Sequence, residues 1–333
     1  MRRCGRLWKR RSPCRGREWD RMSSPDARSA RIRVPASTAN LGSAFDAVGL
    51  ALELFLTVEV SALEAGPSRL EFRGQDASAV PHDSSNLIWR TMEEVAARHE
   101  RTLPPFALRV ENEIPIARGL GSSATARLAA AAAADFLCVL GLGTEGLLEI
   151  ASAAEGHPDN VAPALLGGLV ASISSRPILW TKIDFPSGWT IVAVTPDFEL
   201  ETRRARAVLP AEVPHGDAVY NVQRAAFLMA QLARGDRVGV REAMRDRLHQ
   251  PYRSPLVPGL EEILALDGFE GLIGVALSGA GPTVVALADR GAEEIGGALR
   301  EAFARCGVRS EARLLRADNR GLVRASPRQE ERP

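Results

Sequence analysis

The sequence predicts an α+β protein of about two domains. Segments that alternate apolar and polar residues, as β-strands do, are mixed with longer segments whose apolar residues recur at helical spacing. The two kinds of segment do not alternate one for one, as they would in a doubly wound parallel sheet. Serine, proline and glycine cluster over residues 174–187, which indicates a boundary between two halves. A chain of 333 residues has room for both.

In the first half, a polar, turn-forming stretch at 36–49 separates the first two predicted strands. An alanine-rich segment that follows two serines favours a helix, because alanine has the highest helix propensity. The predicted strands are 32–35, 52–60, 106–110 and 167–173. The predicted helices are 86–100, 124–140 and 144–154.

In the second half, Asp217 and Asp236 stand where a side chain can cap the start of a helix, and Gly235 separates the two helices that they would open. Residues 278–283 form a predicted tight turn between two strands. The predicted strands are 190–194, 271–277, 284–288 and 308–315. The predicted helices are 217–234, 236–248 and 293–306.

Charge is distributed unevenly along the chain, although the net charge is only +1. Residues 1–21 hold nine basic and two acidic side chains, so the rest of the chain is mildly acidic and lacks the basic face that nucleic acids bind. We expect residues 1–30 to be a disordered basic extension. Its composition is typical of a transit peptide or a basic interaction arm; alternatively, translation begins at Met22.

Other features of the sequence favour a cytoplasmic protein. We find no secretory signal and no run of about 18 apolar residues that would span a membrane. Cys138 and Cys306 lie in apolar helical segments without a partner at a useful spacing, which indicates buried thiols in a reducing compartment. The sequence has no cluster of cysteine and histidine with metal-ligand spacing.

The most informative segment runs from residue 115 to 125 and reads Pro-Ile-Ala-Arg-Gly-Leu-Gly-Ser-Ser-Ala-Thr. Gly119 and Gly121 let the backbone bend where a Cβ would clash, and two serines then open the alanine-rich helix. A glycine loop at a helix start leaves several N–H groups at the positive end of the helix dipole, where they can hold phosphate. Serine hydroxyls are also ligands for a hard cation. The simpler interpretation is a turn followed by a helix cap.

Four further motifs stand in order along the chain. They are Val34-Pro-Ala-Ser-Thr-Ala-Asn-Leu-Gly-Ser-Ala-Phe-Asp-Ala-Val-Gly49, His157-Pro-Asp-Asn-Val-Ala-Pro163, Gln250-Pro-Tyr-Arg-Ser-Pro-Leu-Val-Pro-Gly259 and Leu277-Ser-Gly-Ala-Gly-Pro-Thr283. With the glycine loop, they make residues 31–320 resemble the GHMP kinases, a family of small-molecule kinases, and in particular its members that phosphorylate L-homoserine.

The resemblance implies an N-terminal domain like domain 2 of ribosomal protein S5 at residues 31–180, a C-terminal ferredoxin-like domain at 188–320 and a polar tail at 321–333. It implies transfer of the γ-phosphate of ATP, with Mg²⁺, to the hydroxyl of L-homoserine, a step of threonine biosynthesis. The implied partner is this small-molecule substrate, with no nucleic acid and no membrane. A homodimer is one further expectation, since members of the family often form dimers.

The resemblance also implies a set of site residues. Ser123 and Glu155 match the magnesium ligands, and with Asn160 they are the expected catalytic residues. Nucleotide contacts are implied for Pro115, Ile116, Ala117, Arg118, Gly119, Leu120, Gly121, Ser122, Ser123, Ala124 and Thr125. Substrate contacts are implied for Asn40, Asp46, His157, Asn160, Thr202, Arg206, Arg253 and Gly279.

The chemistry of the acceptor agrees with these residue types. Homoserine is a zwitterion, so its carboxylate calls for arginine forks and its ammonium for an acid. Arg206 and Arg253 are the expected forks, with Arg203 and Arg204 as rivals of Arg206. Asp46 is the expected acid.

Simpler interpretations stay open for several of these residues. Arg118 is either a phosphate-binding cation or a surface side chain, Glu155 a metal ligand or a solvated acid at a helix end, and Asp46 a substrate ligand or a cap. His157 either contacts the substrate or orients its loop. The turn at 278–283 can be a hairpin connection as well as part of the site.

The remaining polar candidates receive structural interpretations. We expect His82, His99, His215 and His249 at the surface, and Asn86 as a helix cap. We expect no dedicated general base, because Asn160 rather than Asp159 matches the family position. The hydroxyl proton then leaves late, to the phosphate itself.

Two other functions stay open. A kinase for another small alcohol, such as mevalonate, would not need an acid at Asp46, because mevalonate carries no cation. A nucleotide-binding protein without catalysis would not need Ser123 and Glu155 together.

Overall fold

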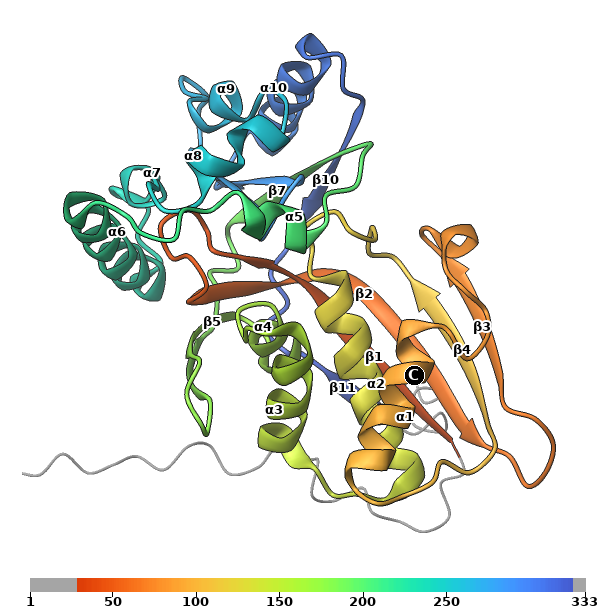
Figure 1. Cartoon of the computed structure of the whole chain (residues 1–333). Coiled ribbons are helices and arrows are strands. Elements are labelled where there is room, and N and C mark those ends of the chain that lie inside the picture. Colours follow the sequence, from red (N-terminus) through yellow and green to blue (C-terminus); the bar gives the residue numbers. More distant parts are fainter. Residues whose placement is uncertain (1–28, 326–333) are drawn as a thin grey trace, which may run out of the picture.

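The computed structural model describes residues 29–325 as two β-sheets, each with helices packed against it (Figure 1). The predicted extension over residues 1–28, the alternative start at Met22 and the last eight residues lie outside the described residues. Within the described part, no helix combines the length and the apolarity that a membrane crossing needs.

The first sheet has seven strands and contains both ends of the described chain. Its main path runs β11–β1–β2–β4–β3, with β5 paired to β2 and β6 paired to β5, and only the β3–β4 pairing is parallel. Its strands are β1 (Ser29–Ala39), β2 (Val48–Ala62), β3 (Arg69–Gly74), β4 (Phe106–Asn112), β5 (Leu169–Ile173), β6 (Leu179–Ile183) and β11 (Val323–Ala325).

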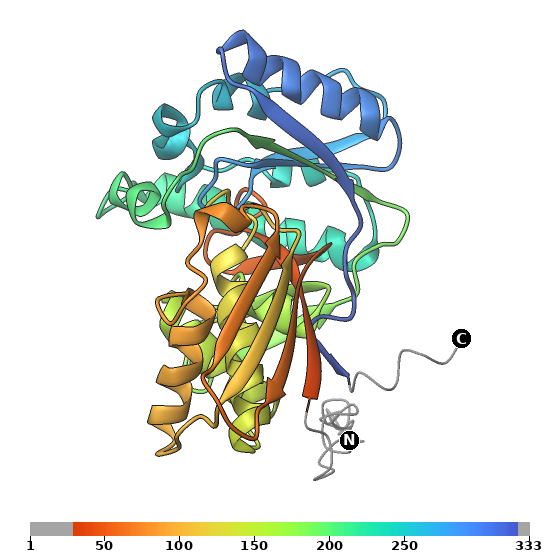
Figure 2. The same cartoon turned by 90° about the vertical axis from the view of Figure 1, so that its right-hand side faces the viewer.

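Helices cover one face of this sheet (Figure 2). The central helix, α2, is the alanine-rich one, and its alanines from 129 to 134 are all fully buried. Small side chains let the helix axis lie close to β1 and β2, which places the start of α2 beside the ends of these strands. The helices are α1 (Leu87–Arg98), α2 (Ser122–Cys138), α3 (Gly143–Glu155) and α4 (Val161–Leu166), with a short η2 (Ala77–Ala79).

The second sheet has four antiparallel strands in the order β10–β7–β9–β8. Helix α10 packs on it through Ile295, Leu299 and Phe303, as its sequence predicts. The strands are β7 (Thr190–Pro196), β8 (Leu272–Leu277), β9 (Val284–Ala288) and β10 (Ser310–Leu315). The helices are α5 (Thr202–Ala207), α6 (His215–Arg234), α7 (Val240–Ala243), α8 (Gln250–Arg253), η3 (Ser254–Leu256), α9 (Leu260–Leu264) and α10 (Ala292–Arg305).

The α+β class and most of the long helices are as predicted. The first two strands extend into the predicted turn segment 36–49, because β1 ends at Ala39 and β2 begins at Val48. The predicted helix 236–248 is wrong, because only Val240–Ala243 is helical. Asp236 accepts the N–H of Val238 in a local turn, and Gly239 follows at φ 75°, so the chain bends there. Helix α6 begins at His215, which places Asp217 in its first turn and not at its cap.

Two further expectations need correction. Cys306 is exposed and Cys138 half-buried, because they lie at the ends of α10 and α2 and not on their buried faces. Strand β6 occupies part of the predicted boundary, and β11 lies within the segment expected to be a polar tail. The chain passes from the first sheet to the second over residues 184–189 and returns over residues 316–322, and the division into two domains stays a prediction.

The last strand ties the end of the described chain to the first sheet. β11 pairs with β1, and Arg324 Nη1 donates to Asp135 Oδ2 of α2 at 3.0 Å. The other Asp135 oxygen accepts the N–H of Leu142 at 3.0 Å. The Asp135 side chain is only 8% exposed, so its partners replace most of its hydration.

We predict that Asp135→Ala lowers the free energy of unfolding by about 3 kcal/mol, because it removes a buried carboxylate that accepts from both Arg324 and Leu142. The measurement is urea denaturation followed by circular dichroism. Asp184→Ala is the matched control, since Asp184 pairs with Lys182 while 77% exposed. The control should change stability by less than about 1 kcal/mol. Equal small losses in both variants would contradict the prediction.

Candidate active site

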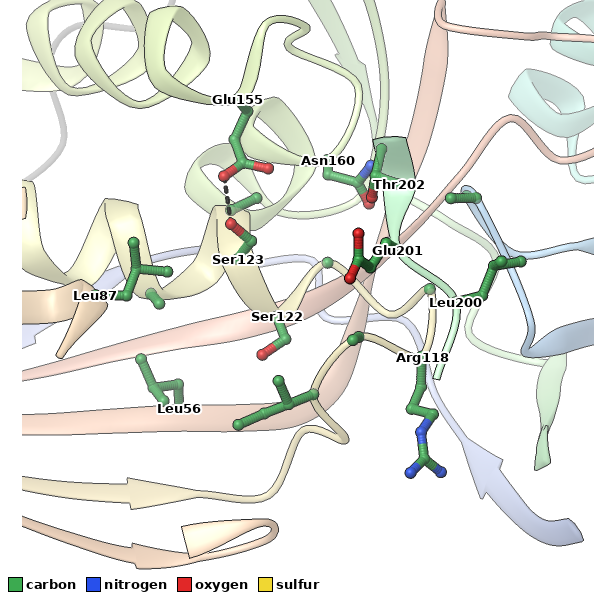
Figure 3. Close-up of a pocket in the computed structure, with 18 of the residues that line it drawn as sticks. Leu56, Leu87, Arg118, Ser122, Ser123, Glu155, Asn160, Leu200, Glu201 and Thr202 are labelled. Carbon is green, nitrogen blue, oxygen red and sulfur yellow. Dashed lines mark hydrogen bonds between the residues drawn. The ribbon is translucent and has the colours of Figure 1, made fainter. Parts of the chain in front are cut away.

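A cavity of about 450 Å³ lies where the two sheets and their helices meet (Figure 3). Its walls come from the start of α2, the loop after β1, the residues that end α3, helices α5 and α8, and the turn between β8 and β9. Both halves of the chain are therefore needed to build it.

The glycine loop forms one wall of the cavity and has the predicted geometry. Gly119 and Gly121 adopt φ of 82° and 71°. A Cβ on Gly121 would lie 2.2 Å from the Ser37 hydroxyl, so no larger residue fits there. Helix α2 begins at Ser122, and the first N–H bonded back into the helix is that of Thr125, to the Gly121 carbonyl. The preceding amides are thus available to a ligand.

The turn between β8 and β9 packs directly on this loop. A Cβ on Gly119 would lie 2.5 Å from the carbonyl oxygen of Ser278 and 2.7 Å from that of Gly281. Ser278 Oγ donates to the Gly119 carbonyl at 2.6 Å, and Thr283 N–H donates to the Arg118 carbonyl at 3.2 Å. The two motifs therefore meet backbone to backbone.

Not every residue of the loop reaches the cavity. Arg118 lines the cavity, but its guanidinium points away from Ser123 and Glu155 (Figure 3), and its Nη1 donates to the Pro196 carbonyl at 3.0 Å. The predicted contacts at Pro115, Leu120 and Thr125 are buried behind the wall. The lining residues of the loop are Ile116, Ala117, Arg118, Gly119, Gly121, Ser122, Ser123 and Ala124.

Ser123 and Glu155 meet beside the start of α2 (Figure 3). Ser123 Oγ donates to Glu155 Oε1 at 2.5 Å, and Arg127 Nε donates to the same oxygen at 2.7 Å. The Glu155 side chain is 15% exposed, so it is not the solvated helix-end acid of the simpler interpretation. Across residues 29–325 no three His, Cys, Asp or Glu side chains gather in a metal-binding cluster, so the protein would supply few ligands to a cation here.

Asp46 and Arg206 form a bidentate ion pair at the other side of the cavity. Arg206 Nη1 and Nη2 donate to the two Asp46 oxygens at 3.0 and 2.8 Å. Both side chains remain about one third exposed, toward the cavity that they line. Arg203 and Arg204, the rivals of Arg206, are exposed and line no part of it. Thr202 lines the cavity from the first turn of the same helix.

Arg253 is buried beside the Asp46–Arg206 ion pair. Only 2% of it is exposed, and its Nε and Nη1 donate to the carbonyls of Ala205 and Gly279 at 3.1 and 2.9 Å. Burial, with the nearby charge of Arg206, lowers the pKa of Arg253 to about 10. The guanidinium therefore stays charged at neutral pH but is held in a poorly solvated place, where an anion would be attracted strongly.

Asn40 and Gly279 mainly shape the site. Asn40 Oδ1 accepts the N–H of Asp46 at 3.0 Å, and its Nδ2 donates to the Gly279 carbonyl at 2.9 Å. Asn40 thus fixes the acid to the turn of the second sheet. Asn86 is likewise a cap, as predicted, since its Oδ1 accepts the N–H of Ile88.

His157, Asp159 and Asn160 line the cavity together at the end of α3. His157 Nδ1 contacts the Asp159 carboxylate, and Asn160 accepts from the Ser37 hydroxyl at 3.1 Å. Burial by itself would lower the pKa of His157, but the hydrogen bond and charge of Asp159 outweigh it, so the pKa is raised. His157 is therefore more cationic at neutral pH than a free imidazole.

The surface assignment of the other histidines holds for His82, His99 and His215 and is wrong for His249. His249 is fully buried beside Arg253. The feature of the sequence that could have indicated this contact is the position of His249 four residues before Arg253, which is one turn of helix. The cavity also has an apolar end that was not predicted from the sequence, lined by Leu56, Phe72, Val80, Leu87 and Ile88.

Comparison with known proteins shows to which family this chain belongs. Residues 86–168 match the model of the GHMP kinases N terminal domain, and residues 228–305 match that of the GHMP kinases C terminal domain. The homoserine kinase of Solibacter usitatus is 44% identical over 293 residues, which are 87% of this chain and 95% of that protein. The chain belongs to the GHMP kinase family.

Other GHMP kinases agree in sequence and in fold. The homoserine kinase of Moorella thermoacetica is 41% identical over 88% of this chain and 98% of its own length. The crystal structure of homoserine kinase from Cytophaga hutchinsonii has a TM-score of 0.80 and 25% identity, over 91% of this chain and 99% of that one. Mevalonate kinase of L. major in complex with R-mevalonate has a TM-score of 0.66 over 90% of this chain and 100% of that one; at 16% identity it shares the fold.

We predict that the His157 ring titrates above the ordinary histidine value of 6.5, and that Asp159→Asn brings its pKa below that of the wild type. The variant removes the charge that favours the imidazolium and leaves the burial that opposes it. Histidine ring signals followed by NMR across pH give both values. Asp197→Asn, which alters an exposed carboxylate elsewhere, is the control. An unchanged His157 titration in Asp159→Asn would show that the contact does not govern the proton.

Proposed function

We propose that this GHMP kinase transfers the γ-phosphate of ATP to the hydroxyl of L-homoserine and releases ADP and O-phospho-L-homoserine. The observation that carries the proposal is the pairing, in one cavity, of a glycine loop at a helix start with a carboxylate and two guanidiniums. The loop suits a triphosphate, and the charged group suits an amino acid. The curated relatives described above are named homoserine kinases.

The acceptor binds by exchanging ion pairs. In the structure Asp46 and Arg206 neutralise each other through two hydrogen bonds. A zwitterion carries both charges, so it can offer each of these side chains a new partner of opposite charge. The ammonium of homoserine takes Asp46 as its partner, and the carboxylate takes Arg206. Arg253 contributes Nη2, which makes no hydrogen bond within residues 29–325, whereas its other nitrogens are committed to the protein. Because Asp46 and Arg206 each exchange one partner of opposite charge for another, the exchange leaves neither of them as an isolated ion.

Phosphoryl transfer then depends on position and charge. The hydroxyl oxygen forms a bond to the γ-phosphorus, the bond to the β-phosphate oxygen breaks, and the hydroxyl proton passes late to the transferred phosphate. Asp159 is engaged by His157 and is 2% exposed, which supports the expectation that no base is dedicated to this proton. Asn160, on the same wall, orients the hydroxyl. In its protonated form, which Asp159 favours by raising the pKa of His157, the ring adds positive charge beside the phosphate.

Magnesium completes the proposal. The Ser123 hydroxyl and Glu155 carboxylate converge beside the amides of α2, and this all-oxygen pair fits a hard cation that keeps waters and phosphate oxygens as its other ligands. Ser123 and Glu155 would hold the ion, and the ion would neutralise phosphate charge. The apolar end of the cavity suits the nucleotide base. The homodimer and the cytoplasmic location stay predictions from the sequence.

We predict that the purified chain releases ADP with L-homoserine as acceptor and forms a product heavier by one phosphoryl group. Asp46 favours this acceptor over mevalonate, which has no ammonium. A coupled ADP assay with both alcohols, joined to mass spectrometry of the products, tests the choice. Turnover of mevalonate without turnover of homoserine would establish the rival kinase, and ATP binding without any transfer would establish a non-catalytic protein.

We predict that Glu155→Ala lowers kcat by about tenfold or more, because metal binding is sensitive to losses of this kind. The loss should be greatest at low magnesium concentration and smaller at high concentration. Rates measured over a magnesium series give the answer. Glu149→Ala, an exposed position on the same helix, is the control and should behave as wild type. A normal Glu155→Ala rate at low magnesium would remove Glu155 from the metal site.

A further inference from the structure

His249 is a buried histidine that no step above uses, and both of its ring nitrogens are committed. Nε2 lies 2.8 Å from the carbonyl oxygen of Gly42, which can only accept, so Nε2 carries the proton. Nδ1 lies 3.1 Å from Arg253 Nη1, which can only donate, so Nδ1 is unprotonated. The contacts thus define a neutral ring with a single tautomer.

The His249 ring joins two parts of the acceptor site that are far apart in the sequence. Gly42 belongs to the loop after β1, which also carries Asp46, whereas Arg253 belongs to α8. The ring of Phe45 stacks on the imidazole at a centroid distance of 4.9 Å and an interplanar angle of 19°. The guanidiniums of Arg206 and Arg253 lie 5.8 and 5.3 Å from the same Phe45 ring. The stacked rings of His249 and Phe45 therefore lie beneath the guanidiniums of Arg206 and Arg253.

The position of His249 is itself held firmly. The buried Asp246 carboxylate accepts the N–H groups of Leu248, His249 and Gln250, which begin α8. It also accepts the Asn221 side-chain amide at 2.7 Å, and that amide donates to the Ser43 carbonyl in the Asp46 loop. The start of α8 and the loop are thus connected at two places, of which only His249 reaches Arg253.

We propose that neutral His249 is a positioning residue for the acceptor. It holds the Arg253 guanidinium at a fixed separation from Asp46, so that both charged groups of an amino acid can be bound at once. This inference rests on the proposed function for the nature of the acceptor. A ring without the Nδ1 lone pair would remove one of the two acceptors of Arg253 Nη1 and leave only the Gly279 carbonyl, and a cationic ring would repel the guanidinium.

Charges around the ring decide its response to pH. Asp246 before α8 and Asp46 in the loop after β1 favour protonation of His249, whereas Arg253 on α8 opposes it. Arg206 on α5 faces Arg253. Burial is the largest cause and lowers the pKa of His249. The ring therefore stays neutral at pH 7, and a change of charge belongs to pH values below 6.5.

The test compares two variants of the full chain by steady-state kinetics. His249→Phe keeps the ring and its stacking but removes both hydrogen bonds, and should raise the homoserine KM by about tenfold or more. The ATP KM should stay within about twofold of wild type. His249→Asn offers an oxygen near the Nδ1 position as acceptor for Arg253, and should restore a large part of the lost homoserine affinity. It also keeps the test valid if His249→Phe does not fold.

Two controls separate positioning from stability. Phe303→Leu loses packing in the core of the second sheet, far from the cavity, and should lower the melting temperature without changing either KM.

In wild type the homoserine KM should rise as pH falls below 6.5, and His249→Asn should lack this rise. The pKa of His157 is raised above 6.5 by Asp159, so its titration belongs to a higher range of pH.

The outcomes are distinct. A wild-type homoserine KM in His249→Phe, or equal rises of both KM values, would overturn the role of His249. Retention of the low-pH rise in His249→Asn would overturn its link to the neutral ring. If wild type does not phosphorylate homoserine at all, the proposed function fails, and the inference fails with it for a separate and visible reason.

Discussion

The close approach of the Gly119 backbone to the turn between β8 and β9 is the contact on which the cavity depends. It joins the helix that presents amides to a ligand with the sheet that carries the arginine side of the site. The absence of a side chain at Gly119 allows carbonyl oxygens of the turn to lie where a Cβ would otherwise stand. Ser278 adds hydrogen bonds to the Gly119 carbonyl and to Thr38 of β1. Each motif thus serves as the partner of the other.

Electrostatics explains why the charged residues gather beside this contact. The positive end of the α2 dipole attracts negative charge, and Arg206 and Arg253 add two cations at the other side of the same cavity. Asp46 offsets one of them and reserves a place for an ammonium group. An anion that took Arg206 as its partner would have to break the Asp46–Arg206 pair and would leave Asp46 without its partner, whereas a zwitterion replaces both partners.

Long, strongly patterned segments could be predicted from the sequence, and contacts between distant segments could not. The alanine-rich helix, the strand at β4 and the stripe of α10 follow from local spacing alone. The prediction of a helix at 236–248 fails because the Asp236 side chain accepts the N–H of Val238, and this local turn competes with a helix. The site motifs identify residue types, but the pairing of Asp46 with Arg206 spans 160 positions. His249 was missed because its burial depends on Gly42 and Phe45, and neither is near it in the sequence.

Acceptor choice must lie in side chains and not in the fold. Mevalonate kinase in complex with R-mevalonate has this same architecture at 16% identity, so the arrangement of sheets and helices admits more than one alcohol. In this chain the acceptor side is assembled from the loop after β1, from α5 and from α8, whereas the glycine loop and Glu155 come from the first half alone. A change of acceptor can therefore arise by substitution around Asp46, Arg206 and Arg253 while the phosphate side is kept. The buried bonds of Arg253 to the carbonyls of Ala205 and Gly279 restrict that freedom, because replacing its guanidinium would also unpair the backbone that surrounds it.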